Sequence, residues 1–532
     1  MKNVNFTVKV SKAGMTGSTK VLFSVALDHL TLDEPRWNSH QVDLGQNGLE
    51  ELTLCFGLEA PTPRDARDPA SGSLQFWVGN PRIRRTHSTA AYAGRPSLLL
   101  ITLDTTRGDH ISAAGYPLPT TPRLDTLAGE GELFTNAVAN SSWTLPTHAS
   151  LFTGLYPSEH GADTNPEGEH EGVWKFNGLN DSAVTLAEQL LDHGYQTAGI
   201  TAGPMVATEF GLAQGFQYYN NPVPEELKPR TADEVTDLAI AWLEAVDAPY
   251  FLFLNYFDPH WPYRPPPDLL QAWVPPHVSA IPDGDQRKIW EAVMRDQRPI
   301  AAEEKESMIT HYDGEIAAMD RAIGRLIDWL REHGQYNSAL VVAVGDHAES
   351  FGEHYMVDHG QSLYEDVVRV PLIIKYPNLA RFWRRGRTIT DRVDQLDVYA
   401  TICRQLDLAL PKRLDSYGVH RARRHHFAEL KRNSWFAGVY GARFDRNLEA
   451  VYEDSWKLIR DNKGNHWLFA LGPDPLERAN LAEVDNLKTR ELAGVLDAWK
   501  ARVQSNRLPA TPLSLSPERT EQLRALGYIG GR

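Results

Sequence analysis

The chain has 532 residues, a length that predicts more than one domain, and its 42% apolar and 23% charged residues are typical of a globular protein with a large core. The formal net charge of −15 argues against a nucleic-acid partner, because such a partner normally requires a basic face. An acidic protein can still bind a small anion where a metal ion concentrates positive charge.

The first residues, MKNVNFTVKVSKAG, lack the apolar core of a secretion signal, and no segment approaches the roughly 20 apolar residues of a membrane span. We therefore expect a cytoplasmic protein without a membrane span. Cys55 and Cys403 both lie in apolar segments, which predicts buried thiols rather than a disulfide framework.

Residues 1–95 are predicted to form a β-rich accessory domain, with a small β-sandwich as the expected architecture. Four segments in this part are rich in strand-forming residues: VNFTVKV, KVLFSVALD, LTLCFGL and SLQFWVGNPRI. None of them carries a chemical motif. The segment RTHSTAAYAGRP that follows has small and polar residues, which indicates a linker.

Residues 96–430 are predicted to form an α/β domain, in which a mainly parallel sheet is sandwiched by helices. Continuous apolar runs, typical of strands buried on both faces, alternate with helix-like segments that end at His-Gly. The runs are SLLLITLD, YQTAGIT, YFLFLNYFD, SALVVAVGD and VPLIIKYP, and two of the helical segments are SAVTLAEQLLDHG and GEIAAMDRAIGRLIDWLREHG.

Residues 431–532 are predicted to form a small C-terminal subdomain. Its short segments are typical of antiparallel strands, and a closing helix is predicted over NLKTRELAGVLDAWKARVQ, before a Pro- and Ser-rich tail that becomes weakly helical. The expected strands are WFAGVYG, EAVYEDSWKLIRD and HWLFAL.

Three of the apolar runs in the α/β domain end in carboxylate or imidazole residues. Asp104 follows the first run, Asp258-Pro259-His260 follows another, and Asp346-His347 follows a third. Ligands of doubly wound sheets bind at the carboxyl ends of the strands, so these side chains are expected on one rim. Any one of them alone is typical of a turn or a helix cap, but together they favour a site for a divalent metal such as Mn²⁺ or Zn²⁺.

Thr144 begins the segment TLPTHASLFTG, in which Pro146 suits the first turn of a helix. A threonine at this position often only caps the helix. A helix N-terminus also attracts anions, so a hydroxyl placed there beside a metal ion could serve as a nucleophile. His148 lies one turn further along and could point back into the same pocket.

The residues from about Pro96 to the end resemble the sulfatase branch of the alkaline phosphatase superfamily. Five motifs stand in the order of that family: LITLDTTRGDH, TLPTHASLFTGLYPSEHG, FDPHWPY, GDHAESFGEHYMVDHGQSLYEDVVRVPLII and WKLIRD followed by LFALGPDPLERANLA. LRALGYIGG resembles the usual tail of the family. The resemblance implies an alkaline-phosphatase-like fold and a site for one divalent metal ion, with Mn²⁺ or Zn²⁺ favoured and Ca²⁺ also compatible.

The sequence departs from the sulfatase pattern at the residues that matter most for chemistry. Thr144 stands where sulfatases have a Cys or Ser that becomes formylglycine, and His148 stands where they have Arg. The pairs Asp104-Thr105 and Asp346-His347 replace the usual Asp-Asp and Asp-Asn pairs. The remaining set resembles phosphonate monoester hydrolases and phosphoglycerol or phosphoethanolamine transferases, although the transferases use Glu at the first position.

This resemblance implies that Asp104, Thr144, Asp346 and His347 hold the metal ion and that Thr144 attacks the substrate. It implies that His260 and His359 contact the transferring group, and His148 is a further candidate for the catalytic set. Arg107 and Asp109 are expected to form a structural ion pair.

We therefore expect a metal-dependent hydrolase of phosphate or phosphonate esters that forms a covalent intermediate on Thr144. A soluble transferase with the same nucleophile, a formylglycine-independent arylsulfatase-like enzyme and an inactive binding protein are the alternatives. Three buried metal-ligand residues without a metal would be costly, which argues against the last. The expected partner is a small anionic ester, and a homo-oligomer is compatible with the sequence.

Overall fold

The computed structural model of the chain describes residues 94–165, 175–222, 228–246, 249–377, 384–412, 414, 416 and 418–525, and the backbone of three earlier strands. The chain divides into two compact units, Met1–Ile83 and Arg84–Arg532.

The first unit contains one described antiparallel sheet in the order β2-β1-β3. Its strands are β1 (Val4–Lys12), β2 (Thr19–Leu27) and β3 (Leu52–Glu59), at the first three segments predicted as strands. The fourth predicted strand, in residues 73–83, lies outside the described residues. The β-sandwich and the domain boundary at residue 95 therefore stay predictions.

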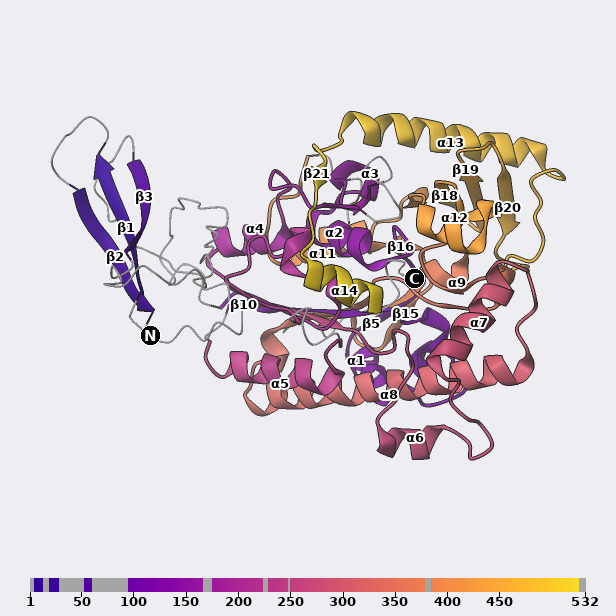
Figure 1. The fold of residues 1–532 in the computed structure, drawn as a ribbon, viewed down its shortest axis with the longest axis horizontal. Coiled ribbons are helices and arrows are strands. Elements are labelled where there is room, and N and C mark those ends of the chain that lie inside the picture. The colour runs from indigo at the N-terminus through magenta and orange to yellow at the C-terminus, as the bar shows by residue number, and fades with distance from the viewer. Residues whose placement is uncertain are drawn as a thin grey trace, which may run out of the picture. The chain divides into compact units, whose positions relative to one another are not determined.

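A mostly parallel sheet forms the centre of the second unit, in the order β15-β5-β14-β11-β4-β10-β8-β9, with β16 beside β5 (Figure 1). The four strands β11, β4, β10 and β8 pair in parallel, whereas β14 runs antiparallel to both β11 and β5. The strand bounds are β4 (Leu98–Leu103), β5 (Glu132–Val138), β8 (Gln196–Thr201), β9 (Tyr218–Asn220), β10 (Tyr250–Tyr256), β11 (Leu340–Gly345), β14 (Arg369–Lys375), β15 (Arg387–Ile389) and β16 (Val393–Asp394).

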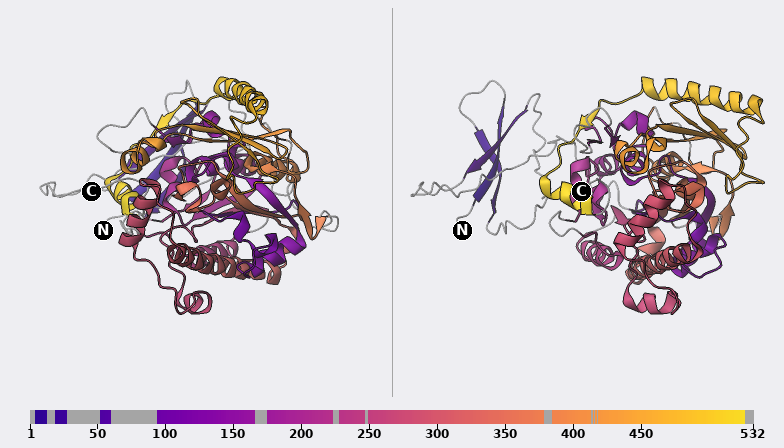
Figure 2. Two further views of the ribbon diagram at one scale, coloured as in Figure 1. Left: turned by 90° about the vertical axis from the view of Figure 1, so that its right-hand side faces the viewer. Right: turned by 45° about the vertical axis from the view of Figure 1, so that its right-hand side comes forward.

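Both faces of this sheet are buried, because successive side chains of a strand point to opposite faces. In β4, Leu98 and Leu100 join one apolar cluster, and Leu99, Ile101 and Leu103 join the other. Figures 1 and 2 show the helices in two layers, one on each face. The first layer holds α2 (Thr144–Thr153), α4 (Leu186–Asp192) and α11 (Gln395–Gln405), and the second holds α1 (Pro122–Glu130), α5 (Ala232–Leu243) and α8 (Ala302–Glu332). The predicted α/β architecture is confirmed.

The predicted His-Gly helix ends are also confirmed. Gly194 follows α4 and Gly334 follows α8, with φ angles of 81° and 70° that glycine adopts without steric cost. Among the described residues, no helix is both long enough and apolar enough to cross a membrane.

A separate four-stranded antiparallel sheet lies toward the C-terminus, in the order β17-β18-β19-β20. Its strands are β17 (His425–Leu430), β18 (Leu448–Glu453), β19 (Trp456–Asp461) and β20 (His466–Ala470), so the first of them precedes residue 431. The predicted closing helix is α13 (Asn486–Ser505), whose Leu492, Leu496 and Trp499 pack with β-sheet residues in one apolar cluster.

The strand predicted at WFAGVYG is wrong, because all but the last of these residues lie in helix α12 (Ser434–Tyr440). The aromatic residues favour a strand locally, but Phe436 and Tyr440 are one helical turn apart and both enter an apolar cluster beside α7 and α8. Asn433 supplies the start signal, since its Oδ1 accepts a hydrogen bond from the Phe436 amide at 3.3 Å. Tertiary packing and a cap therefore outweigh strand propensity.

The remaining described elements are short or peripheral. They are α3 (Pro157–His160), α6 (Pro267–Trp273), α7 (Asp283–Met294), α9 (Glu365–Val368), α14 (Pro517–Ala525), β6 (Asp163–Thr164), β7 (Phe176–Gly178), β12 (Ser350–Phe351), β13 (Val357–Asp358) and β21 (Thr511–Pro512). Short 3-10 helices occupy 108–110, 112–114, 204–206, 208–210, 336–338, 353–355 and 442–444.

Candidate active site

The ends of two neighbouring parallel strands bring three candidate metal ligands together. In the register of β4 and β11, Leu103 is level with Gly345, so the next residues, Asp104 and Asp346, leave the sheet side by side. His347 follows directly. One ligand atom from each of the three side chains lies within 4.8 Å of the others, and all three residues are fully buried.

The donor set fits a divalent cation. Asp104 Oδ1 and Asp346 Oδ2 are buried carboxylate oxygens without a hydrogen-bond partner, which is costly unless something positive binds them. His347 Nδ1 lies 3.2 Å from the Ala348 carbonyl and donates to it, which leaves Nε2 with its lone pair. That Nε2 lies 3.7 Å from Asp104 Oδ1 and 3.4 Å from Asp346 Oδ2.

The protonation states of these groups indicate the same need for a cation. Burial raises the pKa of Asp104 to about 7. It raises the pKa of Asp346 well above its usual value, with repulsion from Asp104 as a second cause. Burial lowers the pKa of His347, so this ring is neutral. Two carboxylates and a neutral imidazole can all be deprotonated together at neutral pH when a metal ion supplies the missing charge.

The second oxygens of both carboxylates are fixed by neighbours. Asn255, in β10, donates from Nδ2 to Asp104 Oδ2 at 3.2 Å. Asp346 Oδ1 accepts from the backbone amides of Thr105 at 3.2 Å and His347 at 2.8 Å. These bonds leave the unpartnered oxygens free to face a ligand, as outer partners of metal ligands do.

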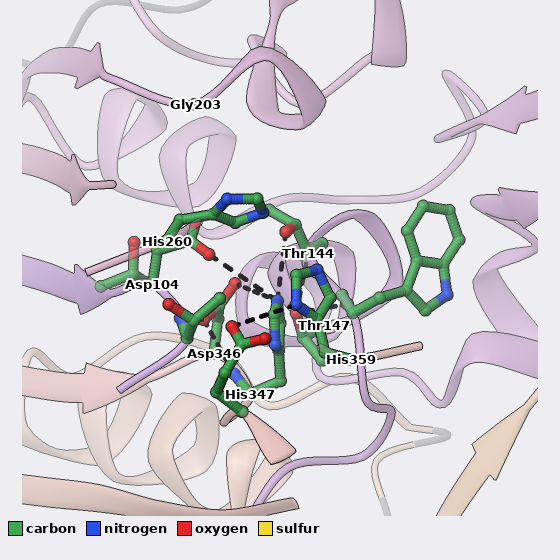
Figure 3. A network of polar contacts seen from close by, with 12 residues as sticks. Asp104, Thr144, Thr147, Gly203, His260, Asp346, His347 and His359 are labelled. Atoms are coloured by element: carbon green, nitrogen blue, oxygen red, sulfur yellow. Dashed lines mark hydrogen bonds and ion pairs between the residues drawn. The ribbon is translucent and has the colours of Figure 1, made fainter. Parts of the chain in front are cut away.

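Thr144 is the first residue of α2, and its hydroxyl caps nothing. The residue before the helix is Trp143, and no side chain accepts a hydrogen bond there as a cap. Thr144 Oγ1 lies 3.2 Å from His347 Nε2 instead. Figure 3 shows Asp104, Thr144, Asp346 and His347 converging from their separate elements. The predicted metal-binding residues therefore lie together in space.

His148 reaches this group from inside α2. Its Nδ1 donates to the Thr144 carbonyl at 2.8 Å, and its Nε2 lies 2.9 Å from Thr102 Oγ1, in β4. The same Nδ1 is 3.6 Å from Asp346 Oδ2. Burial lowers its pKa to about 4, so the ring is neutral. Both nitrogens are engaged, which suits a residue that holds the first turn of α2 against the sheet rather than one that contacts substrate.

His260 and His359 lie beside the four converging residues in Figure 3, with their ring centroids 5.0 Å apart. His260 Nδ1 donates to the Trp261 carbonyl at 2.6 Å, and burial lowers the pKa of His260 to about 3. His359 is also close to His347, at 4.3 Å between ring centroids.

His359 carries a charge that His260 does not. Burial alone would lower the pKa of His359, but Asp358 and Glu349 outweigh burial and raise that pKa well above its usual value. Its Nδ1 lies 2.8 Å from Asp358 Oδ1 and 3.4 Å from Glu349 Oε2. These opposite pKa shifts favour the protonated form of His359 and the neutral form of His260.

A further buried acidic group, Asp394, Asp397 and His426, also has its ligand atoms close together. Arg423 already fills this group, because its Nη2 contacts Asp394, lies 3.1 Å from Asp397 Oδ2 and lies 2.9 Å from His426 Nδ1. This group is an ion-pair network of the fold.

The predicted ion pair of Arg107 and Asp109 is confirmed, with two parallel contacts of 2.9 Å between guanidinium and carboxylate. Sequence reasoning missed Asn255, Glu349 and Asp358. One signal could have found Asn255, since it is the polar residue inside the apolar run YFLFLNYF.

A mostly parallel sheet with helices on both faces, and a buried cluster of two carboxylates and an imidazole at its strand ends, define the class as hydrolases of alkaline-phosphatase-like fold, with a candidate site for a divalent cation. The family comparison agrees: the chain belongs to the sulfatase family, whose model matches residues 96–408. It is thus a hydrolase of the sulfatase superfamily.

The individual relatives are distant in sequence, but each match covers most of both chains. The ulvan-active sulfatase of Formosa agariphila is 24% identical over 449 residues, which cover 77% of this chain and 83% of the relative. The structure of BT4656 in complex with its substrate D-glucosamine-2-N,6-O-disulfate has a TM-score of 0.62 at 19% identity and covers 77% of this chain and 99% of its own. The phosphonate monoester hydrolase of Agrobacterium radiobacter has a TM-score of 0.58 at 22% identity, with coverages of 80% and 100%. Both structures share the fold.

Proposed function

We propose that this protein is a metal-dependent hydrolase of phosphate or phosphonate esters and that Thr144 is its nucleophile. The observation that carries the proposal is the 3.2 Å contact between Thr144 Oγ1 and His347 Nε2, at a helix N-terminus where the hydroxyl caps nothing. A threonine kept only to start the helix would direct its hydroxyl to a backbone amide of the first turn.

Asp104, Asp346 and His347 would hold the metal ion, with Thr144 Oγ1 as a further ligand. The mixed oxygen and imidazole set favours Mn²⁺ or Zn²⁺ and also accommodates Ca²⁺. When bound, the ion would lower the pKa of a coordinated hydroxyl and neutralise an anionic substrate oxygen.

Thr144 Oγ, whose proton would be lost to water, would attack the phosphorus atom as the bond from phosphorus to the leaving oxygen breaks. The N-terminus of α2 supports this step, because its free amides and helix dipole stabilise negative charge at the same place. Water would then attack phosphorus, release the free hydroxyl of Thr144 and complete hydrolysis.

His359 would protonate the leaving oxygen. Its Nδ1 is occupied by Asp358 and Glu349, so the proton available to a substrate is the one on Nε2. His260 is neutral, and its Nδ1 is bound to the Trp261 carbonyl, so its Nε2 would accept a hydrogen bond from the substrate or from water. The pair would therefore give the site a donor and an acceptor.

Sulfate ester hydrolysis is the second candidate, because the names of two similar proteins refer to sulfate esters. One is an ulvan-active sulfatase, and the other is described in complex with its substrate, a disulfated glucosamine. The phosphonate monoester hydrolase favours the first candidate. Threonine also favours it, since a single hydroxyl cannot form the aldehyde hydrate of formylglycine enzymes. A transferase would use the same Thr144 and would differ only in the final acceptor.

A substrate panel tests the proposal. Purified protein loaded separately with Mn²⁺, Zn²⁺ or Ca²⁺ is assayed on aryl phosphate monoesters and diesters, aryl phosphonates and aryl sulfates. We expect the highest kcat/KM on a phosphorus ester and, in protein quenched during turnover, one added phosphoryl or phosphonyl group on the peptide that contains Thr144. Faster turnover of the sulfate with no phosphorus adduct would contradict the proposal. Adding alcohol acceptors to the assay distinguishes transfer of the group to an alcohol from its transfer to water.

A further inference from the structure

The turn that follows β4 has an unfavourable backbone conformation at the centre of the site. Thr105 has a φ angle of 49°, in the left-handed region that β-branched residues avoid. Thr105 is fully buried and directly follows the ligand residue Asp104. Such a conformation persists only where surrounding contacts impose it, and it often marks a functional position.

The side chain of Tyr312 supplies contacts on both sides of this residue. Its hydroxyl donates to the Thr105 carbonyl at 2.8 Å and accepts from the Arg107 amide at 2.8 Å. Tyr312 comes from α8, and its ring is fixed by aromatic neighbours, with centroids 5.0 Å from Phe351 and 5.7 Å from Tyr263. One rigid hydroxyl therefore satisfies two backbone groups of the turn.

The same turn orients the metal ligands. The Thr105 amide donates to Asp346 Oδ1 at 3.2 Å, so the position of the turn determines which Asp346 oxygen is left for a ligand. Arg107 links the turn to the loop after β11, because its Nη1 donates a hydrogen bond to the Glu349 carbonyl, two residues after His347, at 3.0 Å. The loops after β4 and β11 are thus joined through residues 105–107.

We infer that Tyr312 is a positioning residue of the metal centre, which acts by holding the left-handed turn at Thr105 so that Asp104 and Asp346 face one point. The inference rests on the proposed function, since it requires that these carboxylates bind a metal ion. The described hydrogen bonds of the Tyr312 hydroxyl go to the backbone of the turn and not to the side chains of Asp104, Asp346 or His347.

The experiment compares Tyr312→Phe with wild type and with Tyr256→Phe. The matched control removes an equally buried hydroxyl in the same unit, one bonded to Thr236 Oγ1 at 2.7 Å and not to the turn. Mn²⁺ affinity is measured by calorimetric titration of metal-free protein, and folding by thermal unfolding without metal. We expect Tyr312→Phe to weaken Mn²⁺ binding by about 10- to 100-fold, the range seen for outer partners of metal ligands, while Tyr256→Phe changes it less than about threefold.

A second comparison separates positioning from a general loss of stability. Glycine adopts a positive φ without steric cost, so Thr105→Gly should reduce the need for a clamp. We expect Tyr312→Phe to weaken Mn²⁺ binding by a smaller factor in the Thr105→Gly background than in the wild-type background, as coupled neighbours do.

The outcomes are distinct. Equal Mn²⁺ affinity in Tyr312→Phe and wild type would overturn the inference and leave the proposed function intact. The inference would also be overturned if Tyr312→Phe and Tyr256→Phe lost equal Mn²⁺ affinity. It would be overturned as well if Tyr312→Phe weakened Mn²⁺ binding by the same factor in the wild-type and Thr105→Gly backgrounds. A wild-type protein that binds none of Mn²⁺, Zn²⁺ and Ca²⁺ would overturn the proposed function and this inference with it.

Discussion

Thr144 Oγ1 and His347 Nε2 lie 3.2 Å apart although 203 residues separate them in the chain. One belongs to the first turn of α2 and the other to the loop after β11, so the contact exists only because the sheet and the helix layer pack together. It joins the hydroxyl that we propose as the nucleophile to an imidazole that we propose as a ligand of the metal ion.

The first prediction concerns metal content. Asp346→Ala should lose most of its bound divalent metal, because it removes one of two buried carboxylates that each have one oxygen without a hydrogen-bond partner. Elemental analysis of protein purified from metal-supplemented medium measures the change. Asp320→Ala is a suitable control, since that buried carboxylate binds the amides of Arg123 and Leu124 at the start of α1. Equal metal content in Asp346→Ala and wild type would exclude this site.

The parts of the site that sequence could predict are those with a local signal. A buried parallel strand is a continuous apolar run, and the residue after it lies on the ligand-binding rim, which was enough to select Asp104 and the Asp346-His347 pair. The position of Thr144 followed from a helix start signal and from the order of the family motifs.

The parts that sequence could not predict depend on distant partners. Asn255 touches Asp104 across 151 residues, and Tyr312 touches Thr105 across 207 residues. No periodicity or motif spacing in the sequence indicates either contact. The helix α12 was missed for a related reason, because its aromatic residues resemble a strand until their apolar neighbours are known.

The second prediction concerns the leaving group. His359→Gln should lower kcat by about 10²- to 10⁴-fold on alkyl phosphate or phosphonate esters, because a poor leaving oxygen needs a proton. The loss should be much smaller on a nitrophenyl ester, which leaves as a stable anion. His333→Gln, at an exposed position after α8, serves as the control. Equal losses on both kinds of ester would argue that His359 only binds the substrate.

The third prediction concerns the attachment of the C-terminal sheet. Lys457, in β19, is fully buried between Glu365 and Glu477, with contacts of 2.9 Å and 2.8 Å. Lys457→Met should lower the free energy of unfolding by about 3–5 kcal/mol, because it removes the cation that lies between two buried carboxylates. Chemical denaturation measures this change. Lys488→Met, whose ion pairs lie nearer the surface, should cost about 1 kcal/mol or less. Similar costs for the two variants would contradict the prediction.

The last prediction distinguishes the two roles that a threonine at a helix start can have. If Thr144 only stabilised α2, Thr144→Ala would cost about 1 kcal/mol of stability and little activity. As the nucleophile, Thr144→Ala should reduce kcat by at least about a thousandfold while thermal unfolding changes little. Thr144→Ser should keep measurable turnover, because the attacking oxygen remains and only the methyl group is lost.

Thr153→Ala is the matched control for this test. Thr153 lies at the other end of the same helix, is equally buried, and donates its hydroxyl to the Ala149 carbonyl at 2.6 Å. It should lose stability of the same order as Thr144→Ala and keep its kcat. If Thr144→Ala retained full turnover of the best substrate, or if Thr153→Ala lost as much turnover as Thr144→Ala, the hydroxyl of Thr144 would not be the nucleophile, and the covalent mechanism would be wrong.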